Sequence, residues 1–190
     1  MPKQRPTAAG SVVDPDGLKG IIAHGTEGSE SGLMLPDLSF ASFEGLTALE
    51  GLVGQEFLLA AAHARMICDL HWENMRDEQE ARGEPALLHT RVRVINGSLQ
   101  AVWMKASGPV KLGNKDKRYI SREIPKGTGR ESPKYTKRIY MGLSAWEREL
   151  VEYTEGHYEK QRERALITAK WRRLLKRHRQ LVEDSYEDYR

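Results

Sequence analysis

The 190-residue sequence has little cysteine and few apolar residues. It contains one cysteine, Cys68, and only 39% of its residues are hydrophobic. A single cysteine excludes an internal disulfide and a zinc site built from several cysteines, and it is typical of a reducing compartment. The apolar fraction lies below the roughly 45–50% of typical globular chains, which predicts a thin core in an elongated, helix-rich molecule.

Long apolar segments are also missing. No apolar run approaches the roughly 20 residues that a membrane-spanning helix needs. The first twenty residues lack the apolar stretch of a secretory signal peptide. We therefore expect a cytoplasmic protein that has no membrane as a partner.

Recognisable catalytic patterns are absent from the sequence as well. There is no G-x-x-x-x-G-K-[ST] phosphate-binding loop, and no two of the six histidines form an H-x-H or H-E-x-x-H arrangement. The carboxylates occur in charged runs such as RDEQEARGE, which are typical of solvated helix faces. The sequence thus predicts a protein without catalytic residues, bound metal or cofactor.

Charge is abundant, and it is distributed unevenly. The whole chain carries a formal net charge of +3, but residues 44–87 carry −6 and residues 88–143 carry +10. A second basic tract, residues 170–179, contains six cations and no acid. A basic module within a nearly balanced chain indicates a polyanionic partner.

The first part of the chain predicts a tail followed by a helix. Residues 1–42 are rich in Gly, Ser, Pro and Asp, which predicts a disordered tail. Residues 43–82 predict a helix with Ser42 as its N-cap, and Gly83 ends it. Its expected buried stripe has helical spacing: Leu46, Leu49, Val53, Phe57, Ala60, Ala64, Ile67, His71 and Met75.

The basic module, residues 87–141, changes to the two-residue period of β-strands. RVRVI alternates, and Asn96–Gly97 before SLQAVWMKA is a strong hairpin signal. RYISREI predicts a third antiparallel strand. A short fourth strand is expected at Thr136–Met141.

Residues 144–189 predict a second long helix, which begins with a capping box formed by Ser144 and Glu147. The expected apolar series comprises Trp146, Leu150, Tyr153, His157, Ala165, Thr168, Trp171, Leu175, His178, Val182, Tyr186 and Tyr189. The resulting fold class is α+β. Two long helices form an antiparallel hairpin or coiled coil, with a small three- to four-stranded antiparallel sheet inserted between them, in one elongated domain over residues 43–190. A homodimer formed through these helices fits the same pattern.

Single tryptophans on apolar stripes are usually core residues. Trp103, Trp146 and Trp171 are therefore expected in the core, with Trp103 also a candidate for DNA contact. Cys68 lies in an apolar helical tract and is expected to pack without reacting.

The cations of the basic module are the candidate DNA-binding residues. Loop lysines would hold phosphates, while strand-borne arginines would reach base edges from a β-ribbon in the major groove. The candidates are Arg91, Arg93, Lys105, Lys111, Lys115, Lys117, Arg118, Arg122, Lys126, Lys134, Lys137 and Arg138. Two alternatives remain open: these cations pair with the acidic first helix, or they bind an acidic protein partner.

Several motifs resemble a known family. RVRVINGSLQAVWMK, RYISREIPKG, KYTKRIY and the helix start SAWERELVEYTEGHYEKQRERA are similar to the MobI-like conjugative transfer proteins of integrative elements and large plasmids. The resemblance spans about residues 88–180. It implies an accessory role in initiating DNA transfer at an origin of transfer, alongside a relaxase or another transfer protein.

The sequence therefore favours a non-catalytic, DNA-binding accessory protein that acts through the basic sheet. The helices would set spacing, dimerise or dock a nuclease partner. The alternative function is a helical scaffold, chaperone or regulator that binds an acidic protein.

Overall fold

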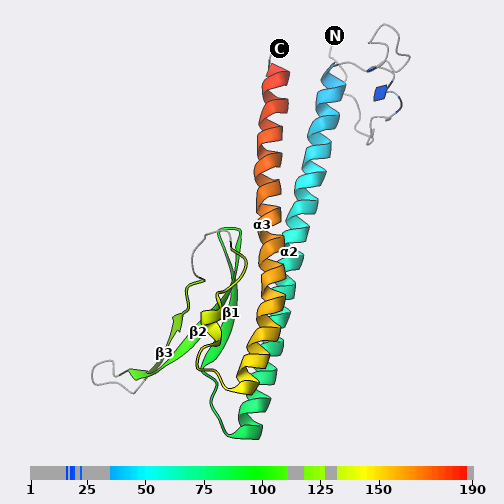
Figure 1. Ribbon diagram of the computed structural model, residues 1–190. Helices are drawn as coiled ribbons and strands as arrows, with labels where there is room; N and C mark the ends of the chain where they lie inside the picture. Colours follow the sequence, from blue (N-terminus) through cyan, green and yellow to red (C-terminus); the bar gives the residue numbers. More distant parts are fainter. Residues whose placement is uncertain are drawn as a thin grey trace. The chain divides into compact units, whose positions relative to one another are not determined.

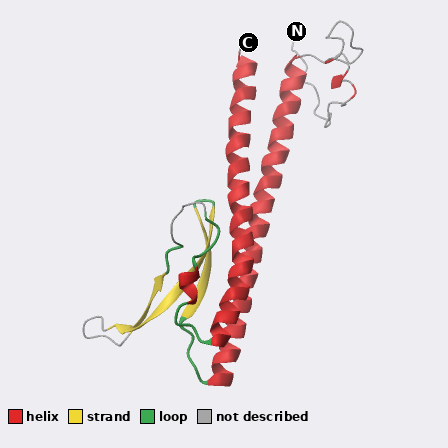
Figure 2. Ribbon diagram, viewed as in Figure 1, coloured by secondary structure: helices red, strands yellow, loops and turns green. Residues whose placement is uncertain are grey.

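The structure, a computed structural model, describes residues 16, 18–19, 22, 35–110, 118–126 and 132–187. In the order of the chain, a three-stranded sheet lies between two long helices (Figures 1 and 2), which confirms the α+β class. The elements are α2 (Leu35–Arg82), β1 (Leu88–Ile95), β2 (Ser98–Val110), β3 (Arg118–Glu123), the 3-10 helix η1 (Lys137–Tyr140) and α3 (Ala145–Glu187).

The chain divides into two compact units. Val53–Trp171 contains the sheet together with the adjoining parts of α2 and α3. Met1–Leu52 and Arg172–Arg190 form the other unit, in which Arg179 of α3 binds Glu50 of α2 at 2.8 Å. The single domain over residues 43–190 stays a prediction.

Helix α2 begins at Leu35, eight residues before the expected start at residue 43. Ser42 consequently lies inside the helix and is not its N-cap. Pro36 and Asp37 account for the earlier start, because proline is favoured in a first turn and a carboxylate there offsets the positive end of the helix dipole. The expected tail thus loses its last eight residues to α2, and most of the remainder lies outside the described residues.

The buried stripe of α2 follows the expected spacing closely. Phe57, Ala64 and His71 are buried, and Cys68 packs in the same core with only 3% of its surface exposed. Leu49 is the exception, because its side chain is exposed. The 3.6-residue period therefore predicted the packed face of this helix well.

The three strands form an antiparallel sheet in the order β1–β2–β3. Asn96 and Gly97 connect β1 to β2 with φ angles of 50° and 68°, the left-handed conformation that a two-residue hairpin turn requires. β1 pairs with the Ser98–Lys105 part of β2, whereas β3 pairs only with the Met104–Val110 part. The outer edge of β2 is therefore left without a strand partner before Met104.

The fourth strand expected at Thr136–Met141 is wrong. This segment contains η1 instead, with Ile139 buried in the core. The turn brings Tyr135 and Ile139 against the core between the sheet and α3. The local sequence pattern therefore indicated a buried residue in this segment, but it did not indicate that the backbone is helical.

Around residues 150–158 the buried face of α3 is displaced by one residue from the expected series, whereas Trp146, Ala165 and Thr168 are buried as expected. Val151, Thr154 and Tyr158 are buried, in place of Leu150, Tyr153 and His157. The displacement arises because the buried face also includes polar and charged residues. These are Glu147, Thr154, Glu155, Gln161, Arg162 and Thr168.

The expected capping box at the start of α3 is not formed. Glu147 Oε1 instead accepts the backbone N–H groups of Leu87 and Leu88, both at 2.7 Å. The buried Ser144 hydroxyl has no hydrogen-bond partner among the described residues. Burial raises the pKa of Glu147. This carboxylate therefore ties the start of β1 to α3 instead of capping its own helix.

The tryptophans divide between core and surface. Trp103 is fully buried and Trp146 is buried, as expected for core residues. Trp171 is 46% exposed, so its placement in the core is wrong. Full burial also removes Trp103 from the residues that could touch DNA in this conformation.

Candidate nucleic-acid interface

The strand register assigns the side chains of the sheet to two faces, because successive residues of a strand point to opposite sides. Leu88, Thr90 and Trp103 are buried on the face that packs against the helices. The opposite face, here called the outer face, carries His89, Arg91, Arg93, Gln100, Val102, Met104, Ser121 and Glu123.

Two predicted DNA-binding residues lie together on the outer face. Arg91 and Arg93 both approach Glu123 Oε2, at 3.8 and 3.1 Å respectively. Arg93 Nε also donates a hydrogen bond of 2.6 Å to Gln100 Oε1. These contacts orient the two guanidinium groups side by side, and Glu123 neutralises part of their charge.

Arg122 does not join Arg91 and Arg93. The register pairs Arg122 with Lys105, and Lys105 with Leu88, which places both cations on the helix-facing side of the sheet. Both side chains are exposed because they extend beyond the packed core. The three strand-borne arginines therefore do not form the single set of base-reading residues that the sequence suggested.

The other described candidates lie after β3. Lys126 is half-buried, and burial lowers the pKa of its amine, with a smaller effect from Arg162. Lys134 forms a 3.1 Å ion pair with Glu159, and Lys137 and Arg138 are exposed on η1. The remaining candidates Lys111, Lys115 and Lys117 lie outside the described residues, and only the backbone of Arg118 is described.

The acidic residues of α2 pair elsewhere. Glu56 binds Arg164 of α3, Asp69 binds Arg65, and Glu78 binds Arg82. None of these three carboxylates pairs with a cation of residues 88–138. This arrangement weighs against the alternative in which the first helix neutralises the sheet.

A buried ion pair supports the sheet from α3. Arg162 and Glu155 bind each other through two contacts, of 2.8 and 3.0 Å, with only 2% and 3% of their side chains exposed. Glu155 also accepts the indole N–H of Trp103 at 2.8 Å and the backbone N–H of Tyr135 at 2.9 Å. The charges are thus embedded in a set of hydrogen bonds, as buried charges require.

This ion pair also closes the unpaired edge of β2. Arg162 Nε donates to the carbonyl oxygen of Ala101 at 3.0 Å, and the Tyr135 hydroxyl oxygen accepts the backbone N–H of Trp103 at 3.3 Å. The backbone N–H of Ile124 donates to the carbonyl oxygen of Trp103 at 2.8 Å. Side chains therefore replace the missing strand where β3 does not reach.

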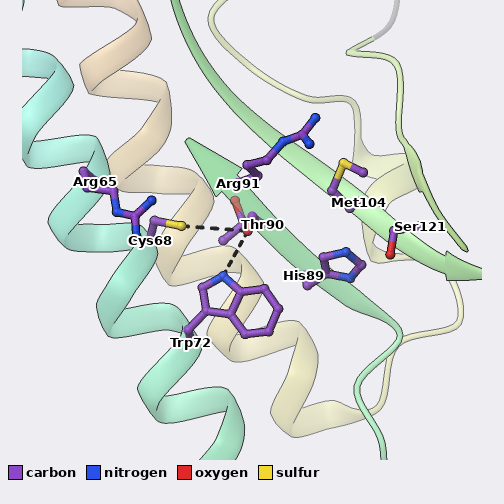
Figure 3. Close-up of a pocket in the computed structure, with 8 residues that line it drawn as sticks. All are labelled: Arg65, Cys68, Trp72, His89, Thr90, Arg91, Met104 and Ser121. Carbon is purple, nitrogen blue, oxygen red and sulfur yellow. Dashed lines mark hydrogen bonds between the residues drawn. The ribbon is translucent and has the colours of Figure 1, made fainter. Parts of the chain in front are cut away.

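An open pocket of about 460 Å³ lies where α2 meets the free edge of β1, next to Arg91. Figure 3 shows Arg65, Cys68 and Trp72 coming from the helix, opposite residues of the sheet. The Thr90 carbonyl oxygen accepts the Trp72 indole N–H at 3.0 Å and faces the Cys68 sulfur at 3.8 Å. The sheet contributes His89, Thr90, Arg91, Met104 and Ser121 to the lining.

Sequence reasoning missed the helical wall of this pocket. Arg65, Cys68 and Trp72 are spaced by three and four residues, so a helix places them on one face. That spacing was the available signal. It was overlooked because Cys68 was interpreted only as a packing residue, which its burial and its raised pKa, caused mainly by burial, also support.

The described residues contain no group of three or more His, Cys, Asp or Glu side chains arranged to hold a metal ion. None of their helices combines the length and apolar character needed to cross a membrane.

Comparison with known proteins gives one match. The model of a protein family described as MobI protein matches residues 60–176, which is more than half of the chain. No curated protein and no solved structure matches. The matched residues include the second half of α2, the whole sheet and the part of α3 that carries Arg162.

Proposed function

Because the chain belongs to the MobI family and so has a role in DNA mobilisation, we propose that it is a non-catalytic accessory protein that binds DNA through the outer face of its sheet. In this role it assists the initiation of conjugative transfer at an origin of transfer, in the cytoplasm and alongside a relaxase. The observation that carries the proposal is the side-by-side placement of Arg91 and Arg93 on that face.

The outer face suits a polyanion for physical reasons. Arg91 is exposed and Arg93 is partly exposed, and each guanidinium can make two hydrogen bonds to a phosphate or to a guanine edge. Glu123 is the only carboxylate among the described residues of the face, and a phosphate can displace it from the two arginines. In the sequence, the exposed cations on η1 and the lysines between β2 and β3 belong to the same basic module.

Binding to duplex DNA tests this proposal. We expect the double variant Arg91→Gln/Arg93→Gln to bind at least about tenfold more weakly, and the slope of log K against log salt to fall by about 2, because each phosphate contact contributes about one unit. Fluorescence anisotropy at several salt concentrations measures both quantities. The matched control is Arg173→Gln/Arg177→Gln, which removes two exposed cations from α3 and should change affinity by less than about twofold.

Glu123→Gln is the complementary variant in the same assay. It removes the carboxylate that competes with phosphate for Arg91 and Arg93, so affinity should rise by several-fold. Unchanged affinity in both the arginine variant and the Glu123 variant would contradict DNA binding by the outer face.

Binding to an acidic protein is the alternative function. The two functions differ in their response to nuclease, because treatment of a fresh cell lysate with nuclease should release a DNA-bound protein and leave a protein complex intact. Co-purification that survives nuclease, combined with a failure to bind purified DNA, would favour the acidic partner.

We also propose that the two helices pair as an antiparallel hairpin and that two copies associate through α2. Leu59, Met66 and Leu70 are exposed. Together with His63 they are spaced by four, three and four residues, as in the seam of a coiled coil. This spacing favours a partner helix over a solvated face.

Light scattering tests the association of two copies. The wild-type protein should have the mass of a dimer, and Leu59→Glu/Met66→Glu should have that of a monomer with an unchanged circular dichroism spectrum, because buried like charges disfavour the seam. The exposed residue Leu174 lies outside this seam, so Leu174→Glu provides the control. A wild-type monomer at micromolar concentration would contradict the dimer.

A further inference from the structure

We infer that the pocket between α2 and the edge of β1 binds one unpaired nucleotide, with its base on Trp72 and His89 and its phosphate between Arg65 and Arg91. The inference rests on the proposed DNA-binding function and adds strandedness to it. It concerns residues that the sequence analysis did not assign to DNA contact, apart from Arg91.

The pocket has the size and lining that a nucleotide needs. Its volume of about 460 Å³ falls within the range of roughly 300–1,000 Å³ that small-molecule sites occupy. The rings of Trp72 and His89 are adjacent, with centroids 5.7 Å apart and planes inclined at 47°. Aromatic rings in a pocket of this size provide a surface on which a base of any identity can stack.

The hydrogen bond of Trp72 fixes the orientation of that surface. The indole N–H donates to the Thr90 carbonyl oxygen on the free edge of β1, so the ring is held where helix and sheet meet. Figure 3 shows Trp72 and His89 next to each other, with Ser121 farther along the sheet. The Ser121 hydroxyl adds a neutral donor and acceptor of the kind that can recognise a base edge.

The charges suit a phosphate beside the rings. Arg65 lines the pocket from α2 and Arg91 lines it from β1. Both arginines are exposed, and their carboxylate partners Asp69 and Glu123 are exposed too, so a phosphate can replace them at little cost. Burial and the neighbouring Arg91 lower the pKa of His89, which keeps its ring neutral and suited to stacking.

The location of the pocket next to the outer face also supports a nucleotide as its ligand. His89, Arg91, Met104 and Ser121 belong to the outer face, so the pocket and the proposed duplex-binding surface are continuous. A base that leaves the stack of a duplex bound on the outer face can reach the pocket without crossing the sheet. Unpaired DNA of this kind arises wherever strands separate at an origin of transfer.

Binding of three oligonucleotides tests the inference: a fully paired duplex, the same duplex with one unpaired nucleotide, and a duplex with an abasic residue at that position. We expect the wild-type protein to prefer the unpaired nucleotide by about tenfold, as stacking of one base allows. Trp72→Leu removes the stacking ring without changing a residue of the outer face, and it should abolish the preference while binding of the paired duplex persists. Arg65→Gln should reduce it, and Lys160→Gln, an exposed cation of α3 that does not line the pocket, should leave it unchanged.

A free deoxynucleoside monophosphate distinguishes the two sources of the ligand. The Trp72 indole N–H signal is followed in a ¹H–¹⁵N spectrum. If both the free nucleotide and the DNA shift this signal, the pocket is a general nucleotide site. If only the DNA shifts it, the pocket binds a nucleotide within a strand. The inference is overturned if neither ligand moves that signal, or if Trp72→Leu retains the preference. Equal binding of all three oligonucleotides by the wild-type protein overturns it while leaving the proposed function intact, whereas failure to bind any of them counts against the proposed function itself.

Discussion

Replacing Arg162 by methionine should lower the free energy of unfolding by about 3–5 kcal/mol, the usual cost of removing one partner from a buried ion pair. The substitution leaves the Glu155 carboxylate buried without its counter-charge and leaves the Ala101 and Pro133 carbonyl oxygens without the donors that bind them at 3.0 and 2.7 Å. Stacking of the guanidinium on Tyr135 and Tyr158 is lost as well. Urea denaturation followed by circular dichroism measures the change.

Arg164 provides a matched control for this prediction. It lies two residues later on α3 and binds Glu56 at 2.7 Å, but about a third of each side chain in that pair is exposed, 31% and 36% respectively. Exposed pairs contribute about 0–1 kcal/mol, so Arg164→Met should cost no more than that. Equal destabilisation by Arg162→Met and Arg164→Met would show that burial of the first pair has no special role.

A double-mutant cycle separates the ion pair from its surroundings. Glu155→Gln alone removes the charge but keeps hydrogen-bonding oxygen near Trp103. The combined variant Arg162→Met/Glu155→Gln should be less destabilised than the sum of the two single variants, because no charge is then left buried without a partner. Strict additivity would contradict the coupling inferred from the two contacts between these side chains.

Acid should destabilise the protein through His71 by about 3 kcal/mol between neutral pH and pH 4, since one pKa unit corresponds to about 1.4 kcal/mol. Burial lowers the pKa of this imidazole from its ordinary 6.5 to about 4, with a smaller effect from His89. The unfolded chain takes up the proton as the pH falls below 6.5, whereas the folded chain resists until about pH 4. Stability is therefore fully present above pH 6.5 and declines between these two values.

The surroundings of His71 explain the shift. Its Nδ1 lies 2.9 Å from the Thr154 hydroxyl oxygen, and its ring packs edge-on against Trp103. Its Nε2 is buried and has no hydrogen-bond partner in the part of the chain that the structure describes. Nothing in this arrangement stabilises a positive charge on the ring. A protonated imidazole would thus be buried unpaired in the centre of the core.

Urea denaturation of His71→Phe at pH 7 and pH 4 measures this contribution. The phenyl ring keeps the contact with Trp103 and cannot be protonated, so the variant should lose less stability than the wild type across that interval. Two other groups titrate in the same range: the lowered pKa of His89 acts in the same direction, and the raised pKa of Glu147 acts against it. An identical decline in both proteins would assign the acid sensitivity to groups other than His71.

Some elements were predictable because local signals determine them. Asn96 and Gly97 require positive φ angles, which few other residue pairs tolerate, so the hairpin and the register of β1 with β2 followed from two residues. The stripe containing Phe57 and Ala64 followed from helical periodicity. Local geometry alone was sufficient in both cases.

Other features depend on contacts between distant residues. Glu155 and Arg162 belong to a charged helical run that periodicity assigns to solvent, yet both meet the edge of β2, more than fifty residues earlier in the chain. That edge needs donors and acceptors only because β3 ends its pairing at Met104. The one-residue displacement of the buried face of α3 has the same cause, since Thr154 and Tyr158 are turned towards His71 and Thr90.

The candidate site was predicted in part. Arg91 and Arg93 were identified from strand alternation, whereas the opposite placement of Arg122 depends on a pairing between β2 and β3 that no local pattern determines. The pocket was missed because its walls come from α2 and the sheet, which contribute Trp72 and His89 respectively. Composition identified the charge of the module but not which side chains share a face.

Only the first part of β2 is held by contacts with the core. Its first part, as far as Trp103, is fixed by β1 and by the Arg162 ion pair, whereas the part from Lys105 onwards pairs with β3, and Lys105 and Arg122 there are exposed. Substitution of these two exposed side chains should therefore change the folding free energy little. Under the proposed function, Arg91 and Arg93 lie opposite the first part of β2, so a change in recognition there is also a change in the part of the sheet that the core fixes.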